Sequence, residues 1–302
     1  MGSASLDALT VENSLLFVQQ GSMMVRELFY SLEADGYQTR DVSLLSGHLL
    51  KAGIVDWTVQ RSTAFHVWCM LGDGSAVCMT LNREQNVAAW HAHRLEHGRI
   101  LSVASLRGSR DTPDEDVWFA VARGEGERAC ITIERLADGH ACLDACTEAV
   151  VRGEALSGLE HLAGCGALLL DGDDACMPIS IDGEGNAACP GRRDGEAVSV
   201  GLAAPAEVRT MPLETLETLG RFKKQLGARA LLHESTLKFR YGTGHPDAWR
   251  DFQPGRYGVA EPYSGYVRMI HNYGMDEQSR FALRVETPDP FNLLALVLDV
   301  EL

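Results

Sequence analysis

The chain has 302 residues, of which 45% are hydrophobic and 23% charged, an ordinary balance for a folded protein with a substantial core. Its formal net charge of −15 argues against general adhesion to nucleic acid or anionic lipid, because both need a basic protein surface. No apolar run approaches the ~20 residues of a membrane span, and the first residues lack the pattern of a signal peptide. We therefore expect no membrane anchor and a protein made in the cytoplasm, with its eight scattered cysteines reduced.

The first elements in chain order predict a hairpin and a short helix. The apolar runs 15–20 and 25–31 flank the turn residues Gly21 to Met24, which is typical of a β-hairpin. Asp41 is then placed to cap a helix that reaches about Leu50, with leucines 44, 45, 49 and 50 as its apolar stripe.

Two near-copies of a second hairpin follow, about fifty residues apart. Val67-Trp68 and Val117-Trp118 each open an apolar strand that leads through a glycine-bearing turn into a second apolar strand ending in charge. A leading strand precedes each hairpin, at 54–60 and at 100–106. We expect 86–95 to pair with 99–106, so that each unit has four strands. Repeats of this period with four strands are typical of β-propeller blades, and the repeated tryptophans are expected to be buried.

The rest of the chain predicts further β-structure. A short helical turn is expected around Cys142 to Cys146. Strands at 166–170, 176–181 and 197–200 alternate with Asp-Gly turns, which predicts a small antiparallel barrel or sandwich. Strands are then expected at 228–241, 266–271, 281–285 and 293–300, the last as a central strand because it is continuously apolar. A helix is an alternative for 213–221.

We weighed three groups of residues as chemical sites. His91 and His93 lie two apart on a predicted strand and so share a face, but zinc needs three or four converging ligands. The acidic runs at 171–174 and 182–186 lack the spacing of an EF-hand and read as turns. The long loop 241–263 is rich in aromatic residues and is a candidate partner contact through Tyr241, Trp249, Tyr257 and Tyr263.

One set of short segments occurs in the same order in a known family and extends over nearly the whole chain: residues 17–37, 82–87, 89–91 with His93, 133–136, 159–164, 200–202, 210–213, 289–291 and 293–296. In these segments the chain resembles the tail nozzle, or tail tubular, proteins of short-tailed bacteriophages and prophages. Family members carry a long N-terminal half before this region, so we expect a fragment or a truncated relative.

The resemblance implies a structural component of the virion tail: a homo-oligomeric ring around the DNA exit channel, joined to adaptor and fibre proteins. It implies no catalysis, no cofactor and no metal, with DNA passing through without specific binding. Two alternatives stay open, a propeller that binds glycan or protein through the 241–263 loop and a metal-dependent enzyme using His91 and His93.

The predicted fold class is all-β with three parts. Residues 1–150 are expected to form propeller-like four-stranded blades, 151–212 a small β-barrel or sandwich, and 213–302 a C-terminal β segment that packs on the repeats.

Overall fold

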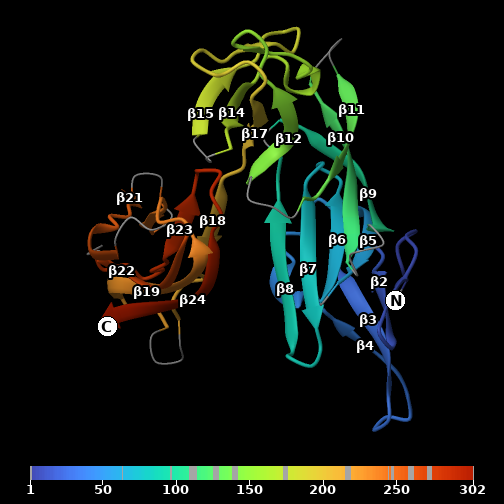
Figure 1. The fold of residues 1–302 in the computed structure, drawn as a ribbon. Coiled ribbons are helices and arrows are strands. Elements are labelled where there is room, and N and C mark those ends of the chain that lie inside the picture. Colours follow the sequence, from blue (N-terminus) through green and yellow to red (C-terminus); the bar gives the residue numbers. More distant parts are fainter. Residues whose placement is uncertain are drawn as a thin grey trace. The chain divides into compact units, whose positions relative to one another are not determined.

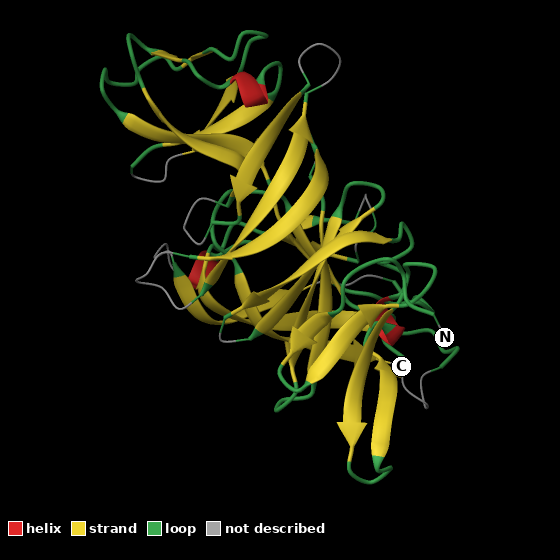
Figure 2. Ribbon diagram, turned by 90° about the vertical axis from the view of Figure 1, so that its right-hand side faces the viewer, coloured by secondary structure: helices red, strands yellow, loops and turns green. Residues whose placement is uncertain are grey.

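The computed structural model describes residues 2–62, 64–95, 97–108, 114–124, 129–137, 142–172, 176–214, 219–243, 245, 248–257, 262–270 and 274–301. Its regular structure is almost entirely β, as predicted, and within the described residues the helical segments are the short 3-10 turns η1 (Leu44–Ser46), η3 (Glu160–Leu162) and η4 (Gly255–Tyr257) (Figure 2). No helix in this part of the chain is long and apolar enough to cross a membrane. The chain divides into two compact units, Met1–Asp138 with His161–Ala163, and Gly139–Glu160 with Gly164–Leu302.

The first unit consists of three antiparallel sheets in which strands follow one another in chain order (Figure 1). Sheet I contains β1 (Leu9–Val11), β2 (Ser14–Val18), β3 (Val25–Ser31) and β4 (Gly36–Asp41). Sheet II contains β5 (Ile54–Arg61), β6 (Phe65–Leu71), β7 (Ala76–Asn82) and β8 (Val87–His93). Sheet III contains β9 (Arg99–Arg107), β10 (Glu115–Arg123) and β11 (Cys130–Arg135).

Sheet II lies between the other two sheets. Successive side chains of a strand point to opposite faces, so sheet II packs on one neighbour with each face. On β6, Val67, Cys69 and Leu71 belong to an apolar core shared with sheet I. Trp68 and Met70 of the same strand belong to a second core, shared with sheet III. Continuous apolar sequence in β6 and β7 is therefore explained by burial on both faces.

Sheet II confirms the four strands predicted for the first Val-Trp unit, but the second unit, sheet III, has three strands among the described residues. The strand pairing around His97 was also predicted wrongly. β8 pairs with β7, and β9 pairs with β10 in sheet III. The expected helix after Asp41 is also wrong: Asp41 ends β4, its carboxylate accepts hydrogen bonds from the Ser43 amide and hydroxyl at 2.7 Å, and only the turn η1 follows.

Trp68 and Trp118, the repeated tryptophans, differ in burial. Trp68 is 4% exposed. Trp118 is only half-buried, because sheet III has a neighbouring sheet on one face and Trp118 points to the other. The expectation that both are buried holds for Trp68 alone.

The second unit begins with an open four-stranded sheet in the order β12-β17-β14-β15. Its strands are β12 (Leu143–Val150), β14 (Gly166–Leu170), β15 (Cys176–Ser180) and β17 (Ala197–Ala203), and β13 (Ala155–Leu156) pairs with β16 (Ala187–Ala188) beside it. The helical turn expected at Cys142 to Cys146 is wrong, since this segment enters β12. β12 pairs with β17, so residues 143–150 belong to this sheet and not to the predicted blades. The described strands of this sheet do not close into a barrel.

The C-terminal strands form two sheets around one apolar core. One sheet has the order β18-β23-β20-β21, with β18 (Ala206–Arg209), β20 (Arg240–Gly242), β21 (Arg250–Asp251) and β23 (Ala282–Val285). The other has the order β22-β19-β24, with β19 (Lys224–Ser235), β22 (Tyr263–Ile270) and β24 (Asn292–Glu301).

Two predictions for this region change. β24 was expected to be central, but it is an edge strand with Leu294 63% exposed. β18 lies before the expected boundary at 212 yet pairs with β23 of the C-terminal part. The helix alternative for 213–221 falls partly outside the described residues, and the packing of 213–302 on the repeats stays a prediction.

Candidate functional site

The histidine pair on β8 lies against an aromatic side chain of the sheet II core. The rings of His91 and His93 are 4.8 Å apart between centroids, and that of His93 is also 4.8 Å from Trp68. Phe119 of β10 contacts the same indole at 5.5 Å. The predicted shared face is therefore confirmed, and the pair sits in aromatic packing.

Desolvation lowers the pKa of both histidines, although His91 is exposed at the surface and His93 only half-buried. Burial, and secondarily the neighbouring His91, lower the pKa of His93 to about 4. Burial and then His66 lower the pKa of His91 as well. The Nε2 atom of His93 is buried without a hydrogen-bond partner.

Neutral imidazoles are the form that binds metal, but two ligands do not make a site. Among the residues that the structure describes, no group of three His, Cys, Asp or Glu side chains is arranged around a common point. The metal-dependent enzyme stays a hypothesis that rests on His91 and His93 alone.

Three of the four aromatic residues of the predicted partner loop, Tyr241, Tyr257 and Tyr263, pack on the apolar core of the C-terminal sheets. Tyr241 is 8% exposed, and its hydroxyl donates a hydrogen bond to the Ile270 carbonyl at 3.1 Å. The rings of Tyr257 and Tyr263 meet edge to face at 5.8 Å. Trp249 is half-buried. The described part of this region includes the end of β20, β21 and η4, and recognition of a partner there stays a prediction.

The acidic runs bind protein groups in the turns that they form. The Asp182 carboxylate accepts hydrogen bonds from the amides of Glu184 and Asn186 at 2.8 and 2.9 Å, and these bonds lower its pKa. Asp171 pairs with Arg192 at 2.5 Å. Asp173 and Asp174 lie outside the described residues.

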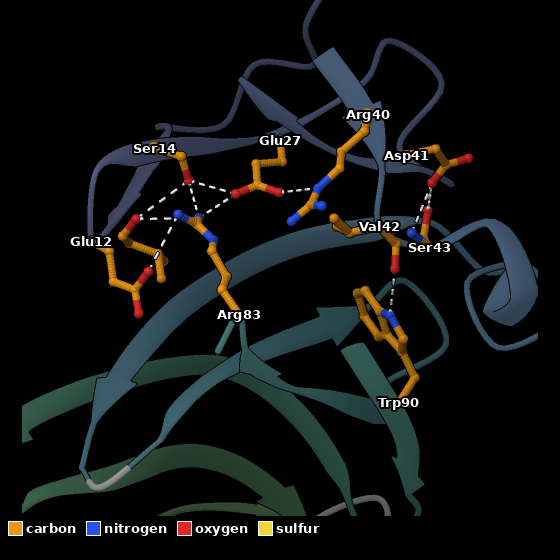
Figure 3. A network of polar contacts seen from close by, with 10 residues as sticks. Glu12, Ser14, Glu27, Arg40, Asp41, Val42, Ser43, Arg83 and Trp90 are labelled. Carbon is orange, nitrogen blue, oxygen red and sulfur yellow. Dashed lines mark hydrogen bonds and ion pairs between the residues drawn. The ribbon is translucent and has the colours of Figure 1, made fainter. Parts of the chain in front are cut away.

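The most connected polar cluster in the described part of the first unit was not predicted. It surrounds Glu27 of β3, whose side chain is 1% exposed (Figure 3). One carboxylate oxygen accepts a hydrogen bond from Ser14 at 2.8 Å and pairs with Arg83, while the other pairs with Arg40 at 2.5 Å. Arg83 also pairs with Glu12 at 3.3 Å.

Figure 3 shows that Arg83 reaches into this cluster from the turn between β7 and β8, so that it joins sheet II to sheet I. A second link lies nearby, where the indole of Trp90 on β8 donates to the Val42 carbonyl at 3.0 Å. A third is the indole of Trp57 on β5, which donates to the Asp7 carbonyl at 2.8 Å. Together these contacts hold two sheets in one relative position.

Sheet II is joined to sheet III by carboxylates of both sheets. Asp56 of β5 accepts hydrogen bonds from the hydroxyl of Ser102 at 2.6 Å and the amide of Val103 at 3.1 Å. Glu115 of β10 accepts one from the amide of Arg61 at 2.8 Å. We call these contacts, with the Glu27 cluster, the inter-sheet contacts.

Sheet III also contains a buried ion pair of its own. Arg123 is 1% exposed and holds Glu134 through two hydrogen bonds of 2.5 and 2.7 Å. Burial alone would raise the pKa of Glu134, but hydrogen bonds from Arg123 and Thr132 outweigh it and lower that pKa. The pair is ionised at neutral pH and fixes β10 against β11.

Comparison with known proteins adds no family. No protein-family model matches the chain, and a search of curated proteins finds no match either. Function must therefore be argued from the arrangement of sheets and from the resemblance in the sequence.

Proposed function

We propose that the chain is a structural component of a phage or prophage tail, part of a nozzle-like ring around the DNA exit channel, and that it performs no catalysis. The observation that carries this proposal is the stack of three sheets with apolar cores on both faces of sheet II. The resemblance of segments such as 17–37 and 82–93 to tail nozzle proteins gives the stack its role.

Rigid joints between sheets suit a scaffold that must keep its shape when DNA and neighbouring proteins exert force on it. Buried ionic contacts fix one geometry, because breaking them leaves an uncompensated charge away from water. In this chain the buried carboxylate of Glu27 has two ionic partners, Arg40 and Arg83, and a hydrogen bond from the Ser14 hydroxyl. Glu27 and Arg83 come from different sheets, so the cluster resists sliding of one sheet over the other.

The net negative charge of the chain suits the lining of a channel through which DNA moves without binding. Duplex DNA is held chiefly by neutralisation of its phosphates with Lys and Arg. With 42 acidic and 27 basic residues, the chain repels phosphate on balance. We expect the partners to be copies of the same chain and the adaptor and fibre proteins of the tail, in the virion.

Particle composition tests this proposal. Particles released by the bacterium that encodes the chain are purified on a density gradient and their proteins identified by mass spectrometry. The proposal predicts the chain in stoichiometric amounts in complete particles. It further predicts that deletion of its gene yields particles that contain DNA but lack the end of the tail. Complete, infectious particles from the deletion strain would contradict it.

A further inference from the structure

A pocket of about 400 Å³ lies at one end of sheet II, beside the turn between β6 and β7. Its floor is apolar, because Leu71 and Val77 of these strands are 3% and 1% exposed. Leu49, which packs on the same core, and Ala92 of β8 complete the apolar lining. A pocket of this size with an apolar floor and a few polar side chains is the usual form of a small-molecule site.

The polar side chains of this pocket are mainly basic. His48 and Lys51 come from the segment after η1, and Arg94 directly follows β8. The chain has 42 acidic residues, yet among the residues that the structure describes no carboxylate lies at ion-pair distance from Lys51 or Arg94. Two exposed cations without a counter-ion give the pocket a positive potential in a chain of net negative charge.

Asp73 also lines the pocket, and the turn uses its carboxylate. Its Oδ1 atom accepts hydrogen bonds from the hydroxyl of Ser75 at 2.6 Å and from the amide of Ser75 at 3.0 Å. These two bonds, with a smaller contribution from the charge of Arg94, lower the pKa of Asp73. The pocket therefore combines two cations with one carboxylate that is already engaged by its own turn.

The backbone around the pocket is held in place by contacts on both sides of the turn. The Gly72 amide donates to the Gly53 carbonyl at 2.9 Å, and Arg99 of β9 donates to the Gly72 carbonyl at 2.9 Å. A Cβ atom at Gly72 would lie 2.7 Å from the carbonyl oxygen of Ala52, so this close approach requires glycine. The segment 48–53 is thereby fixed against the turn, which lowers the cost of ordering the site when a ligand binds.

We propose that this pocket binds a small phosphate monoester, with the phosphate group bound by Lys51 and Arg94 and the organic group on the apolar floor. A phosphate monoester carries a charge of about −1.5 to −2 at pH 7, which matches two cations better than the single charge of a carboxylate. Lys and Arg both form charge-assisted hydrogen bonds to phosphate. His48 adds an imidazole N–H as a further donor.

Isothermal titration calorimetry of the purified chain with phenyl phosphate at pH 7 tests this proposal. A ligand of this size is expected to bind with a dissociation constant of about 0.1–1 mM at ~0.05 M salt, where screening is weak. Inorganic phosphate lacks the group that covers the floor, so it is expected to bind about tenfold more weakly. Benzoate has the ring but a single charge, and it is also expected to bind more weakly than phenyl phosphate.

Three variants locate the binding in this pocket. Arg94→Gln removes one cation and is expected to weaken binding about tenfold. Arg107→Gln is the matched control, because Arg107 is also exposed, lies in the same unit and is at the opposite end of β9 from Arg99. Ala92→Trp fills the pocket without a change of charge and is expected to abolish binding. Circular dichroism confirms that each variant keeps its β-structure.

Four outcomes would overturn the proposal: no binding of phenyl phosphate up to about 10 mM, equal affinity for benzoate, equal affinities of Arg94→Gln and Arg107→Gln, or unchanged binding by folded Ala92→Trp. The pocket is a property of the purified chain, and presence of the chain in particles is measured separately. Failure of the tail role and failure of this site are therefore distinguishable.

Discussion

Glu27 shows at the scale of one residue how the sheets are joined. Its carboxylate is buried, and its partners Ser14, Arg40 and Arg83 come from β2, β4 and the turn after β7. Glu27→Gln keeps the size of the side chain but removes the charge that Arg40 and Arg83 share. Because Arg83 is 23% exposed and keeps Glu12 at 3.3 Å, the expected loss in the free energy of unfolding is about 1–3 kcal/mol, below the cost of breaking a fully buried pair.

Urea denaturation followed by tryptophan fluorescence measures this loss. Four of the five tryptophans, at 57, 68, 90 and 118, lie in the first unit and report its unfolding. Asp116→Asn is the control, because its ion pair with Arg135 lies in the same unit with side chains 31% and 49% exposed, and such pairs contribute about 0–1 kcal/mol. Equal effects of the two substitutions would show that the Glu27 cluster does not hold the sheets.

His93 makes the stability of the first unit depend on pH. Its pKa falls to about 4 in the folded protein, against about 6.5 in an unfolded chain. Between these values the unfolded state binds a proton that the folded state does not, so stability is full above pH 6.5 and falls as the pH drops toward 4. The slope from this residue approaches about 1.4 kcal/mol per pH unit.

Urea denaturation at pH 7, 6 and 5 checks this slope, above the range in which most carboxylates titrate. His93→Gln is expected to flatten it, since Gln takes no proton. Wild-type and variant curves that run parallel would contradict the burial of His93, which faces His91 and Trp68.

At the scale of the elements, the two Val-Trp hairpins are equivalent in sequence but not in packing. Trp68 is covered by sheet III and donates its indole hydrogen to Gln60 at 3.1 Å, whereas Trp118 points away from sheet II. Trp68→Ala is therefore expected to cost ~3–5 kcal/mol. Trp118→Ala removes a side chain that is only half-buried, so it is expected to cost ~1–2 kcal/mol. Thermal unfolding by circular dichroism compares the two, and equal losses would contradict the assigned order of the sheets.

The elements that were predicted correctly are those with local signals. The hairpins at Val25, Val67 and Val117 carry turn residues between apolar runs, and β3, β6 and β10 lie there. The segment after Asp41 has helical spacing, yet Leu44 and Leu45 are 75% and 91% exposed and only Leu50 is fully buried. Spacing alone did not reveal that Leu49 and Leu50 pack on the core while Leu44 and Leu45 stay uncovered.

Prediction failed where it depended on partners distant in the sequence. β24 is apolar enough for a central strand, but only the order of strands shows that β19 takes that place. Likewise, the alternation of β8 predicts that His91 and His93 share a face, while their contact with Trp68 needs the register of three strands. The joining of Glu27 to Arg83 across two sheets has no signal in a single sequence.

At the scale of the whole molecule, charge predicts how the chain meets DNA. Because its net charge is −15, the chain is expected to neutralise few DNA phosphates. Fluorescence anisotropy of labelled duplex DNA is therefore expected to show no binding up to about 10 µM chain at ~0.15 M salt. A basic DNA-binding protein serves as the positive control. Tight binding that weakens steeply with salt would contradict the proposed passive wall.

The central claim is that the chain is a structural component of the tail. The position of the chain on the particle tests this claim most directly. Antibodies raised against the purified chain and coupled to gold are applied to purified particles and viewed by electron microscopy. The account predicts labels at the free end of the tail, and none on particles from the deletion strain. Labels that are absent from intact tails, or that lie on the head, would contradict it.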